Sequence, residues 1–155
     1  MKTGQSLEQK LKDAESKMPG ISGLVQPYKG GFFDMYYSGR LDDAEYLETD
    51  KYQVLASKWE VHSWSDMGGG IAWDERLKIF YREKGKNEIK SLETPEVRTR
   101  DHHDEYRDRK DLMPYDYVFI KPVDASRFEV AWANKEGNKT ERYWVNLDTN
   151  QVSTY

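Results

Sequence analysis

The residues with the clearest capacity for chemistry lie in the stretch Asp101-His102-His103-Asp104-Glu105, which holds two of the three histidines in the chain. Imidazole and carboxylate groups are the usual protein ligands of zinc, iron and nickel. On a helix Asp101 and Glu105 would share one face, whereas on a strand Asp101, His103 and Glu105 would do so. Neither spacing matches the H-E-x-x-H motif of metalloenzymes.

Arginines flank this stretch on both sides and would compete for its carboxylates through salt bridges. A solvated, charged segment is therefore the favoured interpretation, and an incidental or regulatory metal contact is the alternative. No cofactor is indicated by the sequence. The weak candidates for a metal contact are Asp101, His102, His103 and Glu105.

A second candidate site is an acid–base pocket. Asp34 and Tyr36 lie in a predicted strand that follows Gly30-Gly31, and His62 lies in a longer one. In a cup-shaped α+β fold, these three side chains would project from neighbouring strands into a cavity and form an acid–base set. Nucleophilic catalysis has less support, because the chain has no cysteine and no G-x-S-x-G motif.

Tryptophans lie on both sides of three consecutive glycines. Gly68-Gly69-Gly70 is predicted to be a turn, and it lacks the Lys and Ser/Thr of a phosphate-binding loop. Trp64 and Trp73 flank it, close to His62. Aromatic planes that converge near a titratable ring suit a binding pocket or a protein contact. The alternative is that these tryptophans belong to the core.

Charge is unevenly distributed along the chain. Asp42, Asp43 and Glu45 belong to an acidic run with no basic residue between Leu41 and Asp50. Such a run can steer a basic protein partner onto the molecule, although a solvated face would also explain it. The formal net charge of −4 and the pI of about 5.5 argue against a nucleic-acid partner.

The sequence contains no apolar run close to the ~20 residues of a membrane-spanning helix, so no membrane insertion is expected. The N-terminal residues Met1-Lys2-Thr3-Gly4-Gln5-Ser6 lack the apolar region of a signal peptide. The localisation is unknown, since a cytoplasmic protein and a mature exported protein recloned with a new Met would look alike.

Two segments are predicted to be helical. Ser6 followed by Gln9 matches the capping box of a helix start, and apolar residues then recur at a 3.6-residue period to Met18. Residues 6–18 are therefore predicted to be a helix. A second, short helix is predicted over residues 41–48, where Leu41, Ala44 and Leu47 recur at helical spacing.

Strands are predicted from period-two alternation between turn residues. Residues 52–64 form a long one, with one face that mixes apolar and charged side chains such as Lys58 and is expected to be half open to solvent. Residues 115–155 form several short ones. In these, Phe128, Val130 and Trp132 would pack with Tyr143, Val145 and Leu147 on one face, and Trp144 would be exposed on the other.

Together these elements predict an α+β fold, in which an N-terminal helix packs on a mostly antiparallel, meander-rich, twisted sheet. An all-β barrel with a helical lid is the alternative. Residues 1–155 are expected to form a single domain. A mostly charged linker or insertion is expected at about residues 94–113.

For function, the sequence favours a small, non-enzymatic protein-binding module of the inhibitor, immunity or adaptor type that uses an acidic and aromatic surface. The alternative is a small-molecule-binding cavity protein, with a cup-fold enzyme included, that uses Asp34, Tyr36 and His62. The expected partner is therefore another protein. The residues expected to contact it are Trp64, Trp73, Trp144, Asp42, Asp43 and Glu45.

Overall fold

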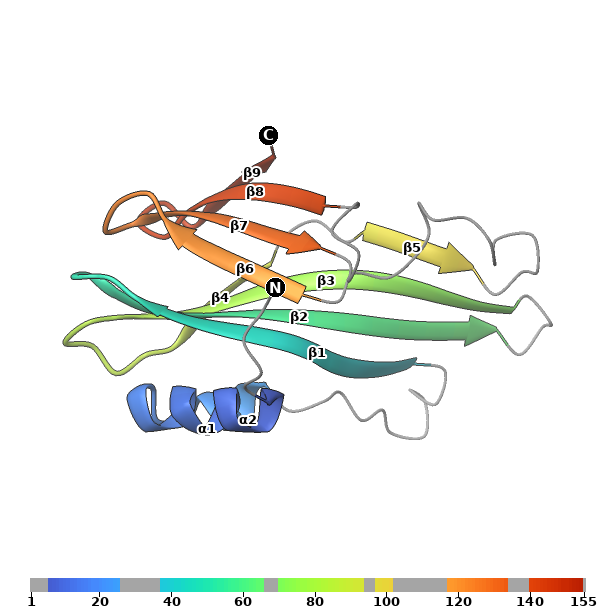
Figure 1. The fold of residues 1–155 in the computed structure, drawn as a ribbon, viewed down its shortest axis with the longest axis horizontal. Helices are drawn as coiled ribbons and strands as arrows, with labels where there is room; N and C mark the ends of the chain where they lie inside the picture. The colour runs from blue at the N-terminus through green and yellow to red at the C-terminus, as the bar shows by residue number, and fades with distance from the viewer. Residues whose placement is uncertain are drawn as a thin grey trace.

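The computed structural model describes residues 6–25, 37–65, 70–93, 97–101, 117–133 and 140–154, and it has three layers (Figure 1). The first layer contains the helices α1 (Leu7–Lys17) and α2 (Ile21–Leu24). The first sheet contains β1 (Tyr37–Glu48), β2 (Tyr52–Ser65), β3 (Gly70–Glu83), β4 (Lys90–Glu93) and β5 (Val97–Asp101). The second sheet contains β6 (Tyr117–Pro122), β7 (Arg127–Ala133), β8 (Thr140–Asn146) and β9 (Gln151–Thr154).

The predicted α+β class is confirmed, with the N-terminal helix packed on antiparallel strands. The first sheet has the order β1-β2-β3-β4, with β5 also paired to β3, and the second has the order β6-β7-β8-β9. Over the described residues neither sheet closes into a barrel, so the all-β alternative is not adopted. The strands divide into two sheets where the sequence analysis expected one, because β6 meets β1 through a side chain of β1, Asp43, rather than through a main-chain ladder.

Helix α1 begins and ends with specific hydrogen bonds. The Ser6 Oγ accepts from the backbone N–H of Gln9 at 3.1 Å, as the capping pattern predicted. At the other end, the carbonyl of Lys17 accepts from Gln53 Nε2 at 2.9 Å and from Arg82 Nη2 at 3.0 Å. These two donors come from β2 and β3, so the first sheet satisfies a carbonyl that the helix itself leaves unpaired.

The predicted short helix over residues 41–48 is wrong, because these residues belong to β1. Their backbone pairs with β2 in a register that runs from Tyr37↔Ser63 to Glu48↔Gln53, with a bulge between Leu41 and Asp43. A bulge inserts one extra residue and shifts the alternation of side chains. Leu41 and Ala44 therefore both pack against the helices although they are three residues apart, a spacing that imitates a helix.

The first sheet is buried on both faces where the helices and the second sheet cover it. Leu55 and Phe80 pack against α1 and α2, whereas Val54 and Ile79 pack against the second sheet. The face of β2 that was expected to be half open to solvent is buried at the side chains that the structure describes there, Val54, Ala56 and Lys58, and Lys58 has no exposed surface. A strand that is covered on both sides shows no clear alternation between apolar and polar residues.

The core between the two sheets contains several large aromatic side chains. Trp132 is fully buried on β7, and its ring centroid lies 6.0 Å from that of Tyr143 on β8. The predicted inward-facing residues of this hairpin are confirmed. The buried side chains that the second sheet contributes to this core are Val118, Ile120, Phe128, Val130, Trp132, Tyr143, Val145 and Leu147.

Part of the predicted charged segment at about residues 94–113 contributes a strand. The backbone of β5 pairs with that of β3, from Glu75↔Val97 to Ala72↔Asp101. The remainder of the segment lies outside the described residues. The assignment of residues 1–155 to a single domain stays a prediction.

Candidate binding surface on the second sheet

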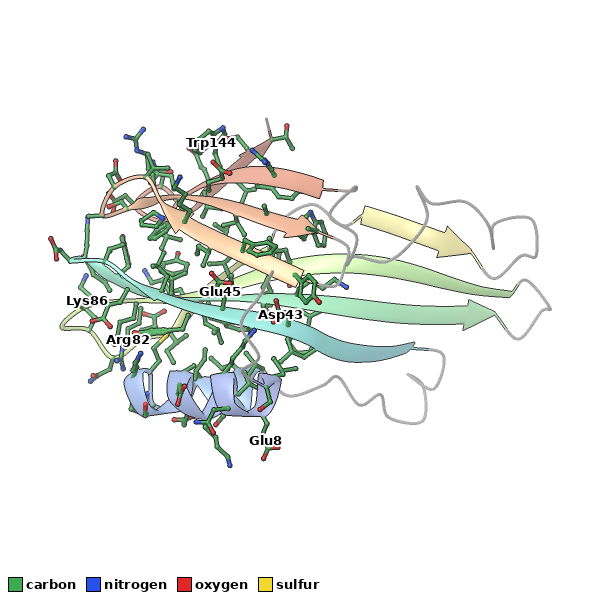
Figure 2. The ribbon with its side chains drawn as sticks, viewed as in Figure 1. Glu8, Asp43, Glu45, Arg82, Lys86 and Trp144 are labelled. Carbon is green, nitrogen blue, oxygen red and sulfur yellow. The ribbon has the colours of Figure 1, made fainter. Side chains whose placement is uncertain are left out.

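The outer face of the second sheet is the side that points away from the first sheet. On β7, Phe128, Val130 and Trp132 are buried, so the alternating residues Arg127 and Glu129 point outward. The same alternation on β8 directs Trp144 outward between the buried Tyr143 and Val145. Figure 2 shows Trp144 on the side of this sheet that lies farthest from the helices. The sequence analysis predicted this orientation of Trp144, and the structure confirms it.

Large apolar side chains are exposed mainly on this part of the molecule. Among the described residues, the exposed large hydrophobics are Phe119 (38% exposed), Val123 (49%), Trp144 (38%) and Leu24 (48%). The first three lie on the second sheet or its β6–β7 turn, whereas Leu24 ends α2 on the opposite side of the first sheet. Exposed apolar side chains that gather on one face of a sheet are a common feature of interaction sites.

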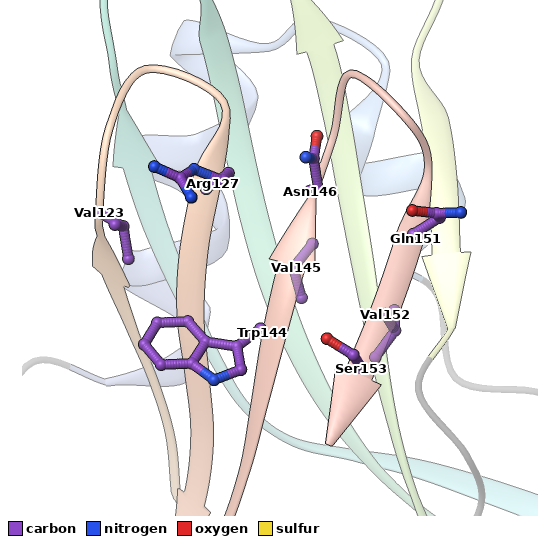
Figure 3. Close-up of a pocket in the computed structure, with 8 residues that line it drawn as sticks. All are labelled: Val123, Arg127, Trp144, Val145, Asn146, Gln151, Val152 and Ser153. Atoms are coloured by element: carbon purple, nitrogen blue, oxygen red, sulfur yellow. The ribbon is translucent and has the colours of Figure 1, made fainter. Parts of the chain in front are cut away.

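Trp144 lies at the side of a shallow depression of about 700 Å³. In the strand register Trp144 lies between Glu129 on β7 and Ser153 on β9. Arg127 is one diagonal position away, and Figure 3 shows its guanidinium and the indole ring separated along the direction of the strands. The residues that line the depression are Val123, Arg127, Trp144, Val145, Asn146, Gln151, Val152 and Ser153.

The guanidinium of Arg127 is oriented by Asp124. Its Nε donates to Asp124 Oδ2 at 2.7 Å, and the other carboxylate oxygen accepts from the backbone N–H groups of Ser126 and Arg127 at 3.0 and 2.8 Å. These bonds hold the pKa of Asp124 below its ordinary value, with the N–H of Ser126 as the largest cause. Within the part of the chain that the structure describes, both terminal amino groups of Arg127 lack a partner. They are available to a ligand.

The residues of the acidic run differ in exposure: Asp43 is buried and Glu45 is half-buried, whereas Glu48 and Asp50 are exposed. Asp43, one of the residues expected to contact a partner, is only 5% exposed. Its Oδ1 accepts from Lys10 Nζ at 2.9 Å, and its Oδ2 accepts from the backbone N–H of Val118 at 2.9 Å. Glu45 is half-buried on the same strand (Figure 2). The side chain of Asp42 lies outside the described part of the structure.

A polar network joins the turns at one end of the two sheets. Asp148 Oδ1, after β8, accepts from Lys51 Nζ at 2.6 Å and from the Tyr52 hydroxyl at 2.7 Å. These hydrogen bonds, with that of Lys51 as the largest cause, lower the pKa of Asp148 to about 2. Burial, followed by the hydrogen bond to Asp148, raises the pKa of Tyr52. This network fixes one sheet against the other and is assigned a structural role.

Most of the other predicted site residues lie outside the described side chains. Asp34, Tyr36, His102, His103 and Glu105 lie outside the described residues altogether. In the backbone register of β2 and β3, His62 is opposite Trp73 and Trp64 is opposite Ile71. Asp101 on β5 is opposite Ala72 on β3. In the described ranges, no group of three or more His, Cys, Asp or Glu residues is placed to hold a metal ion.

Sequence reasoning identified Trp144 but missed Arg127 and Val123. The signal for Arg127 was present, since it alternates with the buried Phe128 and follows Asp124 at a spacing typical of a local ion pair. Its position diagonal to Trp144 depends on the register between β7 and β8. No periodicity within one strand contains that information.

No helix in the described residues is long and apolar enough to cross a membrane. Searches against protein-family models, curated proteins and solved structures find no match to this chain.

Proposed function

We propose that this chain is a small protein-binding module and that the outer face of its second sheet contacts the partner. The observation that carries the proposal is the position of the exposed apolar side chains. Three of the four large ones in the described residues (Phe119, Val123 and Trp144) lie on the second sheet or its first turn. A tryptophan surrounded by polar residues at the side of a depression is typical of a binding hot spot.

The sheet itself supports this assignment, because it presents a rigid platform. Its inner face packs in the core between the sheets, so Trp144 projects from a backbone that is fixed by ladders on both sides. A side chain that is already ordered loses little conformational entropy when a partner binds. The depression of about 700 Å³ also has the size of a small-ligand site, which makes small-molecule binding the second candidate.

The test is selection of binding peptides from a random phage-displayed library on the immobilised chain, followed by affinity measurements with two variants. Trp144→Ala should lower the affinity for the selected peptides by at least about tenfold, since an interface tryptophan typically contributes about 2 kcal/mol or more to the binding free energy. Leu24→Ala is the matched control, because it removes another exposed apolar side chain (48% exposed, against 38% for Trp144) on the other side of the molecule. It should leave the affinity unchanged.

Both variants should unfold at nearly the wild-type temperature, since each changes an exposed side chain. If the peptides bind the Trp144→Ala variant as tightly as they bind the wild type, the binding surface does not include Trp144 and the proposal is wrong. If no peptide were selected and a parallel screen of small aromatic compounds gave a ligand that Trp144→Ala weakens, the second candidate would be favoured.

A further inference from the structure

We propose that the segment that docks on this face is acidic, with a carboxylate two residues from an apolar side chain in an extended peptide of a protein partner. This inference rests on the proposed function and specifies the chemistry of the partner. The carboxylate would bind the terminal amino groups of Arg127, and the apolar side chain would pack on the indole of Trp144.

The charge of the outer face differs in sign from that of the whole chain. The chain has 28 acidic and 24 basic residues, a formal net charge of −4. On the described part of the outer face and its first turn, three basic side chains (Lys121, Arg127 and Arg142) accompany two acidic ones, Asp124 and Glu129. The exposed tryptophan therefore lies in a local excess of positive charge, which favours a negatively charged partner.

Both carboxylates of this face are already engaged by its own arginines. Arg127 Nε lies 2.7 Å from Asp124, and Arg142 Nη1 lies 3.8 Å from Glu129. The first contact uses one edge of the guanidinium and leaves two amino groups for a second carboxylate. A planar guanidinium that is held by one carboxylate is well placed to bind another through two parallel hydrogen bonds.

The strand register sets the spacing that a ligand must match. Arg127 is opposite Asn146, and Trp144 is opposite Glu129, so Arg127 and Trp144 are diagonal neighbours. Diagonal neighbours of adjacent strands lie about 7–8 Å apart. Side chains at positions i and i+2 of an extended peptide point the same way and lie about 7 Å apart. A carboxylate and an apolar side chain at that spacing can reach Arg127 and Trp144 together.

A nucleic acid is the competing anionic ligand, because a base could stack on Trp144. The structure favours a peptide for two reasons. Asp124 and Glu129 lie on the same face and would repel a continuous line of phosphates. The net charge of −4 also opposes a polyanion more strongly than a short segment with two or three carboxylates.

The inference can be tested with three blocked peptides that share a Leu at the centre. The first has Glu at both positions two residues from the Leu, the second has Gln there, and the third has Lys. Titration of the isotope-labelled chain by NMR gives both the affinity and the location of binding. The Glu peptide should bind at least about fivefold more tightly than the Gln peptide, and the Lys peptide more weakly than either.

Two charge-neutralising variants provide the residue-level test. Arg127→Gln should reduce the affinity for the Glu peptide to that for the Gln peptide and leave the affinity for the Gln peptide unchanged. Lys86→Gln is the matched control, because Lys86 forms an i,i+3 ion pair with Glu83 at 2.8 Å in a different turn, as Arg127 does with Asp124. This variant should bind both peptides like the wild type. The melting temperatures of both variants show whether the turns stay folded.

Each outcome separates the inference from the proposed function. Equal affinities for the Glu and Gln peptides, both weakened by Trp144→Ala, would overturn the acidic partner and support the binding surface. No binding of the Glu peptide at about 1 mM, which corresponds to about 4 kcal/mol, would also overturn the inference. Changes in NMR chemical shift that map to another face of the molecule would overturn the proposed function. If a thymidine oligonucleotide binds more tightly than the Glu peptide, the ligand of this face is a nucleic acid and not an acidic peptide.

Discussion

At the scale of single residues, the carboxylate of Asp43 joins all three layers. It accepts hydrogen bonds from Lys10 on α1 and from the backbone of Val118 on β6, and it belongs to β1 itself. Its partner across the β1–β2 ladder is Lys58, which has no exposed surface. Directly opposite residues point to the same face of a sheet, so Asp43 also places negative charge near a buried ammonium group.

Asp43→Ala should lower the free energy of unfolding by about 3–5 kcal/mol, because it leaves buried charge and a buried N–H without this acceptor. Chemical denaturation at neutral pH measures the loss. Asp43→Asn is the matched control, since its amide oxygen can still accept one of the two hydrogen bonds. This variant should therefore lose less free energy of unfolding than Asp43→Ala. A loss below about 0.5 kcal/mol for Asp43→Ala would show that the carboxylate has no structural role.

Trp132 and Trp144 show how one residue type takes two roles on the same sheet. Trp132 is fully buried between the sheets, and Trp144 is 38% exposed on the outer face. The difference follows from their positions in the alternation of β7 and β8. Their roles were predictable from sequence because a half-buried strand repeats every two residues. The contribution of Arg127 to the same face was not predicted, since it depends on the neighbouring strand.

At the scale of elements, helix α1 packs on the first sheet and is also held by specific hydrogen bonds at both ends. The Ser6 hydroxyl caps its first turn, and Gln53 and Arg82 bind the Lys17 carbonyl at the last. The first contact is local and was visible in the sequence. The second depends on β2 and β3, which are far away in the chain.

Ser6→Ala should lower the free energy of unfolding by about 1 kcal/mol, because it removes the oxygen that accepts from the Gln9 N–H. The matched control is Ser16→Ala in the last turns of the same helix. The Ser16 hydroxyl donates to the Asp13 carbonyl, which a helix does not require, so this variant should be neutral or slightly stabilising. Equal losses for the two serines in thermal or chemical denaturation would argue against a specific cap.

The strand β1 shows why a local pattern can indicate the wrong element. The bulge between Leu41 and Asp43 shifts the side-chain alternation by one residue, and Leu41 and Ala44 consequently face the same layer. A spacing of three is normally a helical signal. Here it results from strand pairing, and the partner strand that reveals it lies in residues 52–63.

At the scale of the whole molecule, the turns at one end hold the sheets in register. Asp148 binds Lys51 and Tyr52, Thr49 Oγ1 donates to the Ala125 carbonyl at 2.8 Å, and the Tyr81 hydroxyl donates to Asn150 Oδ1 at 2.5 Å. All four hydrogen bonds join a strand or turn of the first sheet to a turn of the second. This end of the molecule is therefore expected to respond to pH as one unit.

The pKa of Asp148 predicts the direction of that response. Because its folded-state pKa is about 2 and its ordinary value is 3.8, the ionised carboxylate favours the folded state above pH 3.8. This contribution should be lost as the pH falls from about 4 through 2. Denaturation at a series of pH values should show the stability difference between the wild type and Asp148→Asn shrinking over that range. A difference that is constant from pH 6 to about 2 would exclude this carboxylate as a cause.

The sequence by itself determined the features that depend on near neighbours. They are the capped first helix, the α+β class, the inward and outward residues of the C-terminal strands, and the exposed Trp144. Each follows from a period, a cap or a turn within a short stretch of chain. Tertiary structure alone decided the burial of Asp43 and Lys58, the strand over residues 41–48 and the diagonal placement of Arg127 and Trp144 on adjacent strands. These depend on registers and sheet contacts between distant segments, because burial of a polar group is settled by what covers it.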